Sequence, residues 1–151
     1  NSSALKERPA DLDIRNNLLR ASSVAGLAFS NTTTAAAHSM SYPLTIHYGI
    51  PHGVASSISL LPLLDINGKS IKKSLDIICE NNELTYNELK QTIKEIPQGV
   101  VPYTLDKWGI NEDQLPKLAE ESFTKGRMDN NIVDLSTDDV LDILTELYCE
   151  Q

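Results

Sequence analysis

The sequence predicts an all-α protein built as a helical bundle of about seven helices. Apolar residues recur at spacings of three and four along most of the chain, and no segment alternates apolar and polar residues as a half-buried strand does. Capping residues open several of the periodic segments. A chain of 151 residues with 40% hydrophobic content can bury one core without disulfides. We therefore expect a single α-helical domain over residues 1–151.

The first two helices are expected before residue 43. The first runs over about residues 11–29 and carries small residues on one face. Thr34, His38 and Tyr42 then lie at four-residue steps in an alanine-rich segment. Pro43 disfavours helical geometry at Tyr42, so we expect His38 near the C-terminal end of the second helix.

The third helix is expected to be the central one. Pro51 suits a first helical position, which makes His52 the second residue of this helix. From Val54 to Leu64 the segment is apolar almost all round, as in a helix buried in the middle of a bundle. Pro62 should bend it.

Four more helices are expected in the second half. The first is marked by Ile71, Leu75 and Ile78, and the second starts with a capping box and a hydrophobic staple made by Leu84, Thr85, Glu88 and Leu89. The third is marked by Leu115, Leu118, Ala119 and Phe123. The fourth is capped by Ser136, Asp138 and Asp139 and continues with the apolar residues Val140, Ile143, Leu144, Leu147 and Tyr148. The second of these helices stops at Pro97, and residues 98–110 form a long connection.

Charge and composition narrow the class of partner. Thirteen Lys and Arg residues against 21 Asp and Glu residues give a net charge of −8, with no basic block and only 5% aromatic residues. This argues against a nucleic-acid groove and against binding to an anionic membrane surface. The longest apolar stretch, residues 58–66, is interrupted by polar residues and is shorter than the roughly 20 residues of a membrane span. We expect small molecules or proteins as partners, and homo-oligomerisation stays open.

The cysteines and the first residues bear on location and completeness. Cys79 and Cys149 have no metal or redox spacing, as is usual for reduced thiols in a cytoplasmic protein. The chain starts at Asn1 without a methionine, and the segment up to Pro9 has no hydrophobic signal core. We expect a cytoplasmic protein and a piece of a longer chain.

Two histidines have the layout of a metal site. His38 and His52 lie fourteen residues apart around Pro and Gly residues that break helices. Neutral imidazole is the commonest protein ligand for transition metals, and a helix N-terminus favours the neutral form at His52. Tight sites have three or four protein ligands, so the pair is half of one. The alternative for His52 is an ordinary helix-start histidine bonded to a nearby carbonyl.

Three further residues are candidates for lining a substrate pocket beside the metal. Phe29 and Tyr42 are close in sequence to the His38 segment, although each also fits a core position. His47 lies five residues before His52 and fits a pocket rim or an ordinary surface position.

Motifs in four segments surround the two histidines. They are Gly26-Leu27-Ala28-Phe29-Ser30-Asn31, Ala37-His38-Ser39-Met40-Ser41, Gly49-Ile50-Pro51-His52-Gly53-Val54-Ala55 and Leu60-Leu61-Pro62. In order and spacing they resemble the iron-containing alcohol dehydrogenases. Later segments continue the resemblance, namely Trp108-Gly109-Ile110, Leu118-Ala119, Asn130-Asn131 and Leu135-Ser136-Thr137-Asp138-Asp139-Val140. The resemblance covers only the family's C-terminal helical domain, which is dehydroquinate synthase-like.

The resemblance implies a metal site that is completed from outside this sequence. In such enzymes an N-terminal α/β domain binds NAD(P), and four side chains of the helical domain hold a divalent metal in the interdomain cleft. His38 and His52 match two of the four, whereas an aspartate and a third histidine have no counterpart here. The chain is thus expected to lack its NAD(P)-binding domain, which would be its partner. Many members have a histidine where Tyr42 stands, so the role of Tyr42 stays open.

The implied function is hydride transfer between an alcohol and an aldehyde or ketone. Fe(II) or Zn(II) and NAD or NADP would be the cofactors, and a small alcohol or aldehyde the substrate. The isolated chain is expected to be inactive, and no catalytic or cofactor-binding residue is assigned in it. Residues 41–45, Ser-Tyr-Pro-Leu-Thr, resemble the branch that reduces phosphonoacetaldehyde, which is one alternative. The other is a helical binding module without chemistry.

Overall fold

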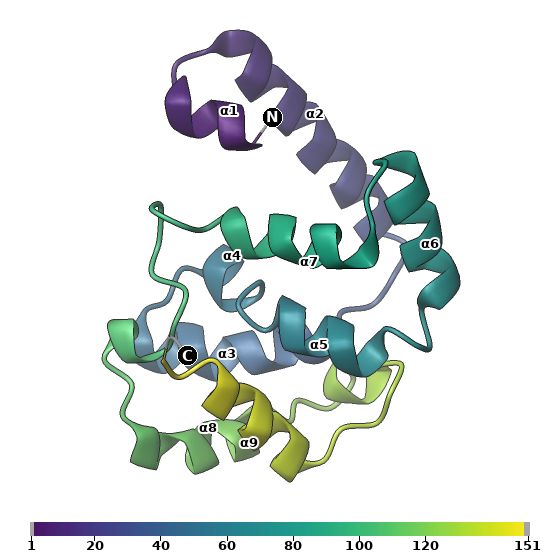
Figure 1. The fold of residues 1–151 in the computed structure, drawn as a ribbon. Helices are drawn as coiled ribbons and strands as arrows, with labels where there is room; N and C mark the ends of the chain where they lie inside the picture. Colours follow the sequence, from purple (N-terminus) through teal and green to yellow (C-terminus); the bar gives the residue numbers. More distant parts are fainter. Residues whose placement is uncertain (1, 150–151) are drawn as a thin grey trace. The chain divides into compact units, whose positions relative to one another are not determined.

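The computed structural model describes residues 2–149, and in this part of the chain all regular structure is helical (Figure 1). The prediction of an all-α class is confirmed. Two differences raise the number of α-helices above the seven expected. A short helix, α1 (Ser2–Glu7), precedes the first predicted one, and the third predicted helix is split in two. None of the described helices is both long and apolar enough to cross a bilayer.

The chain forms two compact units, and the first of them ends at Thr33. Its main element is α2 (Leu12–Phe29), which confirms the predicted helix. Asp11 caps α2, because one of its carboxylate oxygens accepts hydrogen bonds from the backbone N–H groups of Asp13 and Ile14, at 3.0 and 3.1 Å. Ile14, which follows this cap, is 6% exposed.

The second unit begins with α3 (Ala36–Tyr48), which runs straight through Pro43. The expectation that His38 lies near a helix C-terminus is therefore wrong, because His38 is in the first turn of α3. Proline removes the helical hydrogen bond to the carbonyl of Ser39. Burial of Pro43 and of Leu44, which is 1% exposed, favours the continuous helix enough to offset that loss.

Instead of one bent helix from Pro51 to Leu64, the chain forms α4 (His52–Ala55) and α5 (Leu60–Asn67). The predicted single helix is wrong, and α4 begins one residue later than expected, with Pro51 as its N-cap. Pro62 explains the break. A helix passing through it would lose a hydrogen bond, whereas in the first turn of α5 the missing N–H has no helical partner to lose.

Helices α6 (Lys72–Asn81) and α7 (Tyr86–Glu95) follow as predicted. Thr85 and Glu88 form the expected capping box at the start of α7. This pair of helices is connected to α5 by a hydrogen bond from the Tyr86 hydroxyl to the carbonyl of Leu64, at 3.2 Å. An ion pair at 2.6 Å between Lys90 on α7 and Asp65 on α5 adds a second link.

The last two α-helices, α8 (Leu115–Glu121) and α9 (Thr137–Glu146), pack against each other, and α8 also packs against α3. Ser136 caps α9 through a reciprocal pair of bonds with Asp139, as predicted. Phe123 was expected on α8 but lies beyond its end and is exposed. The predicted connection over residues 98–110 is confirmed.

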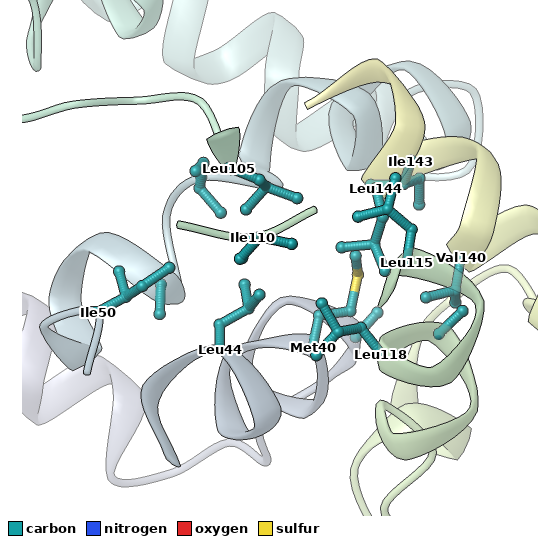
Figure 2. Packing of buried hydrophobic residues seen from close by; sticks show 14 of the residues in the cluster. Met40, Leu44, Ile50, Leu105, Ile110, Leu115, Leu118, Val140, Ile143 and Leu144 are labelled. Atoms are coloured by element: carbon teal, nitrogen blue, oxygen red, sulfur yellow. The ribbon is translucent and has the colours of Figure 1, made fainter. Parts of the chain in front are cut away.

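The core of the second unit lies where α3, α8 and α9 meet the segment around Ile110 (Figure 2). Its buried side chains include Met40, Leu44, Ile50, Leu105, Ile110, Leu115, Leu118, Val140, Ile143 and Leu144. A buried serine ties α3 to this core. The Ser39 hydroxyl donates to the carbonyl of Ser122 at 2.5 Å and accepts from the N–H of Thr124 at 3.1 Å. The position of the first turn of α3 is thereby fixed.

Candidate metal centre

The structure brings His38 and His52 side by side. Their ring centres lie 5.4 Å apart, and the ring planes meet edge to face at 66°. Because a metal–nitrogen bond is about 2.0–2.1 Å long, two imidazoles on one ion have ring centres roughly 5 Å apart. The observed separation therefore fits two ligands of a single metal ion.

The turn between α3 and α4 creates this proximity. Gly49 ends α3 in the left-handed region at φ 65°, a conformation that costs glycine little, and its N–H donates to the carbonyl of Thr45. Ile50 then enters the core and is fully buried. Pro51 directs the chain into α4, whose first residue is His52. This turn brings the rings of His38 and His52 together, although the two residues are fourteen positions apart in the sequence.

The surroundings of His38 favour the form that binds metal. Burial, the neighbouring His52 and the positive charge of Arg127 all lower the pKa of His38 below its ordinary value of 6.5. The ring is therefore neutral at pH 7, and a neutral imidazole nitrogen can bind a cation without first losing a proton.

The polar contact of His52 is with a side chain of α3. Its Nδ1 atom lies 3.5 Å from the Ser41 hydroxyl, which itself donates to the carbonyl of His38 at 2.7 Å. The Tyr42 ring stacks on the His52 ring. The two ring centres lie 6.3 Å apart, and the ring planes are 19° from parallel. The described contacts therefore do not support a helix-start histidine bonded to a backbone carbonyl.

A metal site needs more ligands than this pair supplies. Within the part of the chain that the structure describes, no three side chains of His, Cys, Asp or Glu come together as a possible metal site. The donor set that the structure does bring together is two imidazoles, which suit Fe(II) or Zn(II) better than Mg(II) or Ca(II).

His47 belongs to a neighbouring hollow and not to the histidine pair. Its Nε2 atom lies 2.9 Å from a carboxylate oxygen of Glu121 on α8. The hollow has a volume of about 440 Å³ and is lined by Tyr42, Pro43, Ile46, His47, Glu121, Thr124 and Arg127. Tyr42 thus lies against His52 and also borders a space that a small molecule could enter.

The sequence of residues 1–148 matches the family model described as the Fe-containing alcohol dehydrogenase family, C-terminal. The chain belongs to this family. An NADPH-dependent butanol dehydrogenase of Clostridium saccharobutylicum is 30% identical over 76% of this chain and 31% of its own length. A 4-hydroxybutyrate dehydrogenase of Clostridium kluyveri is 27% identical over 91% of this chain and 39% of its own length.

Solved structures share the fold. An alcohol dehydrogenase from Oenococcus oeni has a TM-score of 0.74 at 23% identity, over 97% of this chain and 42% of that one. A 1,3-propanediol oxidoreductase has a TM-score of 0.64 at 20% identity, over 76% of this chain and 32% of that one. The chain therefore spans between about a third and two fifths of the Fe-containing alcohol dehydrogenase relatives that it matches.

One predicted pocket residue lies outside the second unit. Phe29 is the last residue of α2 in the first unit and is 50% exposed. The expectation that Phe29 lines a substrate pocket stays a prediction.

Sequence reasoning missed Arg127. Its guanidinium carbon lies 4.9 Å from the centre of the Tyr42 ring, and its Nη1 atom donates to the Thr34 hydroxyl at 3.0 Å. Arg127 stands in a loop without periodicity or capping pattern, so no local signal separates it from the other basic residues of the chain. Only the tertiary structure brings Arg127 to the ring of Tyr42, which in turn stacks on His52.

Proposed function

We propose that this chain is the helical, metal-binding part of an NAD(P)-dependent, iron-type alcohol dehydrogenase that interconverts an alcohol and an aldehyde or ketone by hydride transfer. The observation that carries this proposal is the pairing of His38 and His52 at a separation that suits one metal ion. The names of the relatives, which include a butanol and a 4-hydroxybutyrate dehydrogenase, support the reaction type.

In this proposal His38 and His52 hold Fe(II) or Zn(II) through one nitrogen each. Such an ion, when bound, supplies a Lewis acid that lowers the pKa of an alcohol and polarises a carbonyl. The chain's own contribution is to favour the neutral form of His38 and to orient the ring of His52. Partial burial does the first, and the stacked Tyr42 ring together with the Ser41 hydroxyl does the second.

The remaining parts of the enzyme are proposed to lie elsewhere in the whole protein. Two imidazoles are fewer than the three protein ligands of a usual catalytic site, and the chain covers 31% and 39% of two dehydrogenase relatives. We place the remaining metal ligands and the NAD(P) site there, with the nucleotide-binding domain as the partner of this chain. The free cysteines Cys79 and Cys149 support a reducing compartment such as the cytoplasm.

The substrate is proposed to be a small alcohol or aldehyde. Tyr42 and His47 line the hollow beside the pair, which supports both as pocket residues. A volume of about 440 Å³ falls within the 300–1,000 Å³ that is typical of small-molecule sites.

The test is His52→Ala in the full-length protein. Loss of one of the ligands should abolish metal retention, measured by elemental analysis, and abolish turnover, while circular dichroism keeps its helical signal. The matched control is His47→Ala, which removes an exposed imidazole five residues away and should leave the metal content unchanged. Unchanged metal content in His52→Ala would sink the proposal and favour a binding module without chemistry.

A further inference from the structure

Arg127 is fixed in place close to the histidine pair. It follows α8 in the chain and precedes the short turn η3 (Met128–Asn130), and its side chain is half-buried. The hydrogen bond to Thr34 and the cation–π contact with Tyr42 hold the guanidinium on the Tyr42 side of α3. A guanidinium that is held by two contacts loses little further freedom when a ligand binds to it.

The charge of Arg127 is not balanced by a carboxylate among residues 2–149. No Asp or Glu oxygen of this part of the chain makes an ion pair with it. Two carboxylates that lie near it in sequence are used elsewhere. Glu121 binds His47 at 2.9 Å and Lys117 at 3.6 Å, and Asp129 accepts from the N–H of Gly126 at 2.6 Å.

The donors of Arg127 are also largely unused. A guanidinium has five N–H donors in a planar fork, and the described side chain gives one of them to Thr34. A half-buried cation without a counter-charge is unfavourable for the protein alone, because desolvation is not repaid by an ion pair. Such a group is well suited to an anion that arrives from outside.

Arg127 and the histidine pair share one neighbour, Tyr42. The Tyr42 ring contacts both the Arg127 guanidinium and the His52 ring. Arg127 also lines the same hollow of about 440 Å³ as Tyr42. A small molecule in this hollow can therefore contact Arg127 and also Tyr42, the residue of the hollow that stacks on His52.

We propose that Arg127 binds the oxyanion of a small molecule, a carboxylate, phosphate or phosphonate, that enters the hollow lined by Tyr42 and Arg127. The proposal rests on the dehydrogenase function and specifies its substrate class as aldehydes with an anionic end. The fork of the guanidinium matches the spacing of two oxygens in these groups. Arg127 holds the non-reacting end and takes no part in hydride transfer. A phosphate of the nicotinamide nucleotide is the other source of the same chemistry.

The first experiment measures anion binding without turnover. Methylphosphonate is titrated by calorimetry into the full-length protein after its metal has been removed with a chelator. Arg127→Gln should weaken binding by about 10- to 100-fold, as expected for the loss of a charge-assisted fork. Lys125→Gln removes the same charge from an exposed position in the same loop and should bind as the unaltered protein does. Equal binding by all three proteins, or no binding by the unaltered one, overturns the proposal.

The second experiment distinguishes the two sources. With the metal-loaded enzyme, Arg127→Gln should raise KM for succinate semialdehyde by about tenfold or more while KM for butanal and kcat for butanal stay near their original values. A merely structural role through Thr34 or Tyr42 would affect both aldehydes alike and would overturn the proposal. A rise in KM for NADH or NADPH with both aldehydes would assign the oxyanion to the nucleotide and overturn the substrate class.

The two experiments distinguish a failure of the anion site from a failure of the dehydrogenase function. If the unaltered, metal-loaded enzyme turns over no aldehyde while methylphosphonate still binds through Arg127, the dehydrogenase function fails and the anion site stands. If both aldehydes are turned over and Arg127→Gln changes neither KM nor binding, the anion site fails and the function stands.

Discussion

Single residues on α3 differ sharply in what they contribute, although they are neighbours in sequence. Leu44 is 1% exposed and packs in the main core, whereas Ile46 on the same helix is 73% exposed and borders the hollow beside Tyr42. Helical geometry alone explains this, since residues two apart point to opposite sides of a helix. The stability of the helix therefore depends on which apolar residues face α8, and not on how many there are.

Leu44→Ala should lower the free energy of unfolding by about 2–5 kcal/mol, because it leaves a cavity in a packed core. Ile46→Ala should change it by less than about 0.5 kcal/mol, since that side chain is mostly in water. Urea denaturation of the two variants beside the unaltered protein measures the difference. Equal midpoints for the two variants would contradict the assignment of the core.

At the scale of the element, two prolines have opposite effects on the helices of this chain. Pro43 lies inside α3 without ending it, whereas Pro62 coincides with a new helix, α5. Pro43 costs α3 one helical hydrogen bond, whereas Pro62 costs α5 none because it lies in the first turn. Around Pro43 the flanking turns are buried against the core, and this packing maintains the helix. Caps are more dependable, because the bonds between Ser136 and Asp139 are made within one turn.

The cap of α9 should make stability depend on acidity. Hydrogen bonds from the Ser136 hydroxyl and backbone lower the pKa of Asp139 below its ordinary value of 3.8. The ionised carboxylate therefore stabilises the folded state above the unfolded pKa, and this contribution is lost as the pH falls through the lowered value. Asp139→Asn mimics the protonated form, so it should be less stable than the unaltered protein near neutral pH and equally stable in strong acid.

Thermal unfolding of both proteins as a function of pH measures this gap. Asp138→Asn removes a charge from the same turn of α9 without touching the cap bonds, so it separates the cap from the helix dipole. A gap between Asp139→Asn and the unaltered protein that stays constant down to strong acid would contradict the role of the cap.

At the scale of the whole molecule, the proposed chemistry needs more than these residues. The second unit brings together two imidazoles, a tyrosine stacked on one of them and an arginine over the same tyrosine ring, and the chain spans only 31% and 39% of two dehydrogenase relatives. Hydride transfer requires a bound nicotinamide beside the metal, which we place on the remainder of the enzyme.

The 151-residue chain alone should therefore give no oxidation of NADH or NADPH with any aldehyde, even with Fe(II) or Zn(II) added. Two protein ligands bind a metal more weakly than the three or four of a usual site. Nicotinamide absorbance measures turnover, circular dichroism verifies that the chain is helical, and the full-length enzyme is the positive control. Robust turnover by the helical chain would refute the view that the site is shared.

Local chemistry in the sequence determined the all-α class, the caps of α7 and α9, and the end of α7 before Pro97, because each depends on hydrogen bonds and backbone preferences within a few residues. The candidate pair His38 and His52 was also found from the sequence, through its motifs. Only the tertiary structure decided that α3 continues through Pro43 and that Arg127 meets Thr34, a residue 93 positions away. Such contacts depend on how buried faces pack between distant segments, and packing leaves no signal in a local pattern.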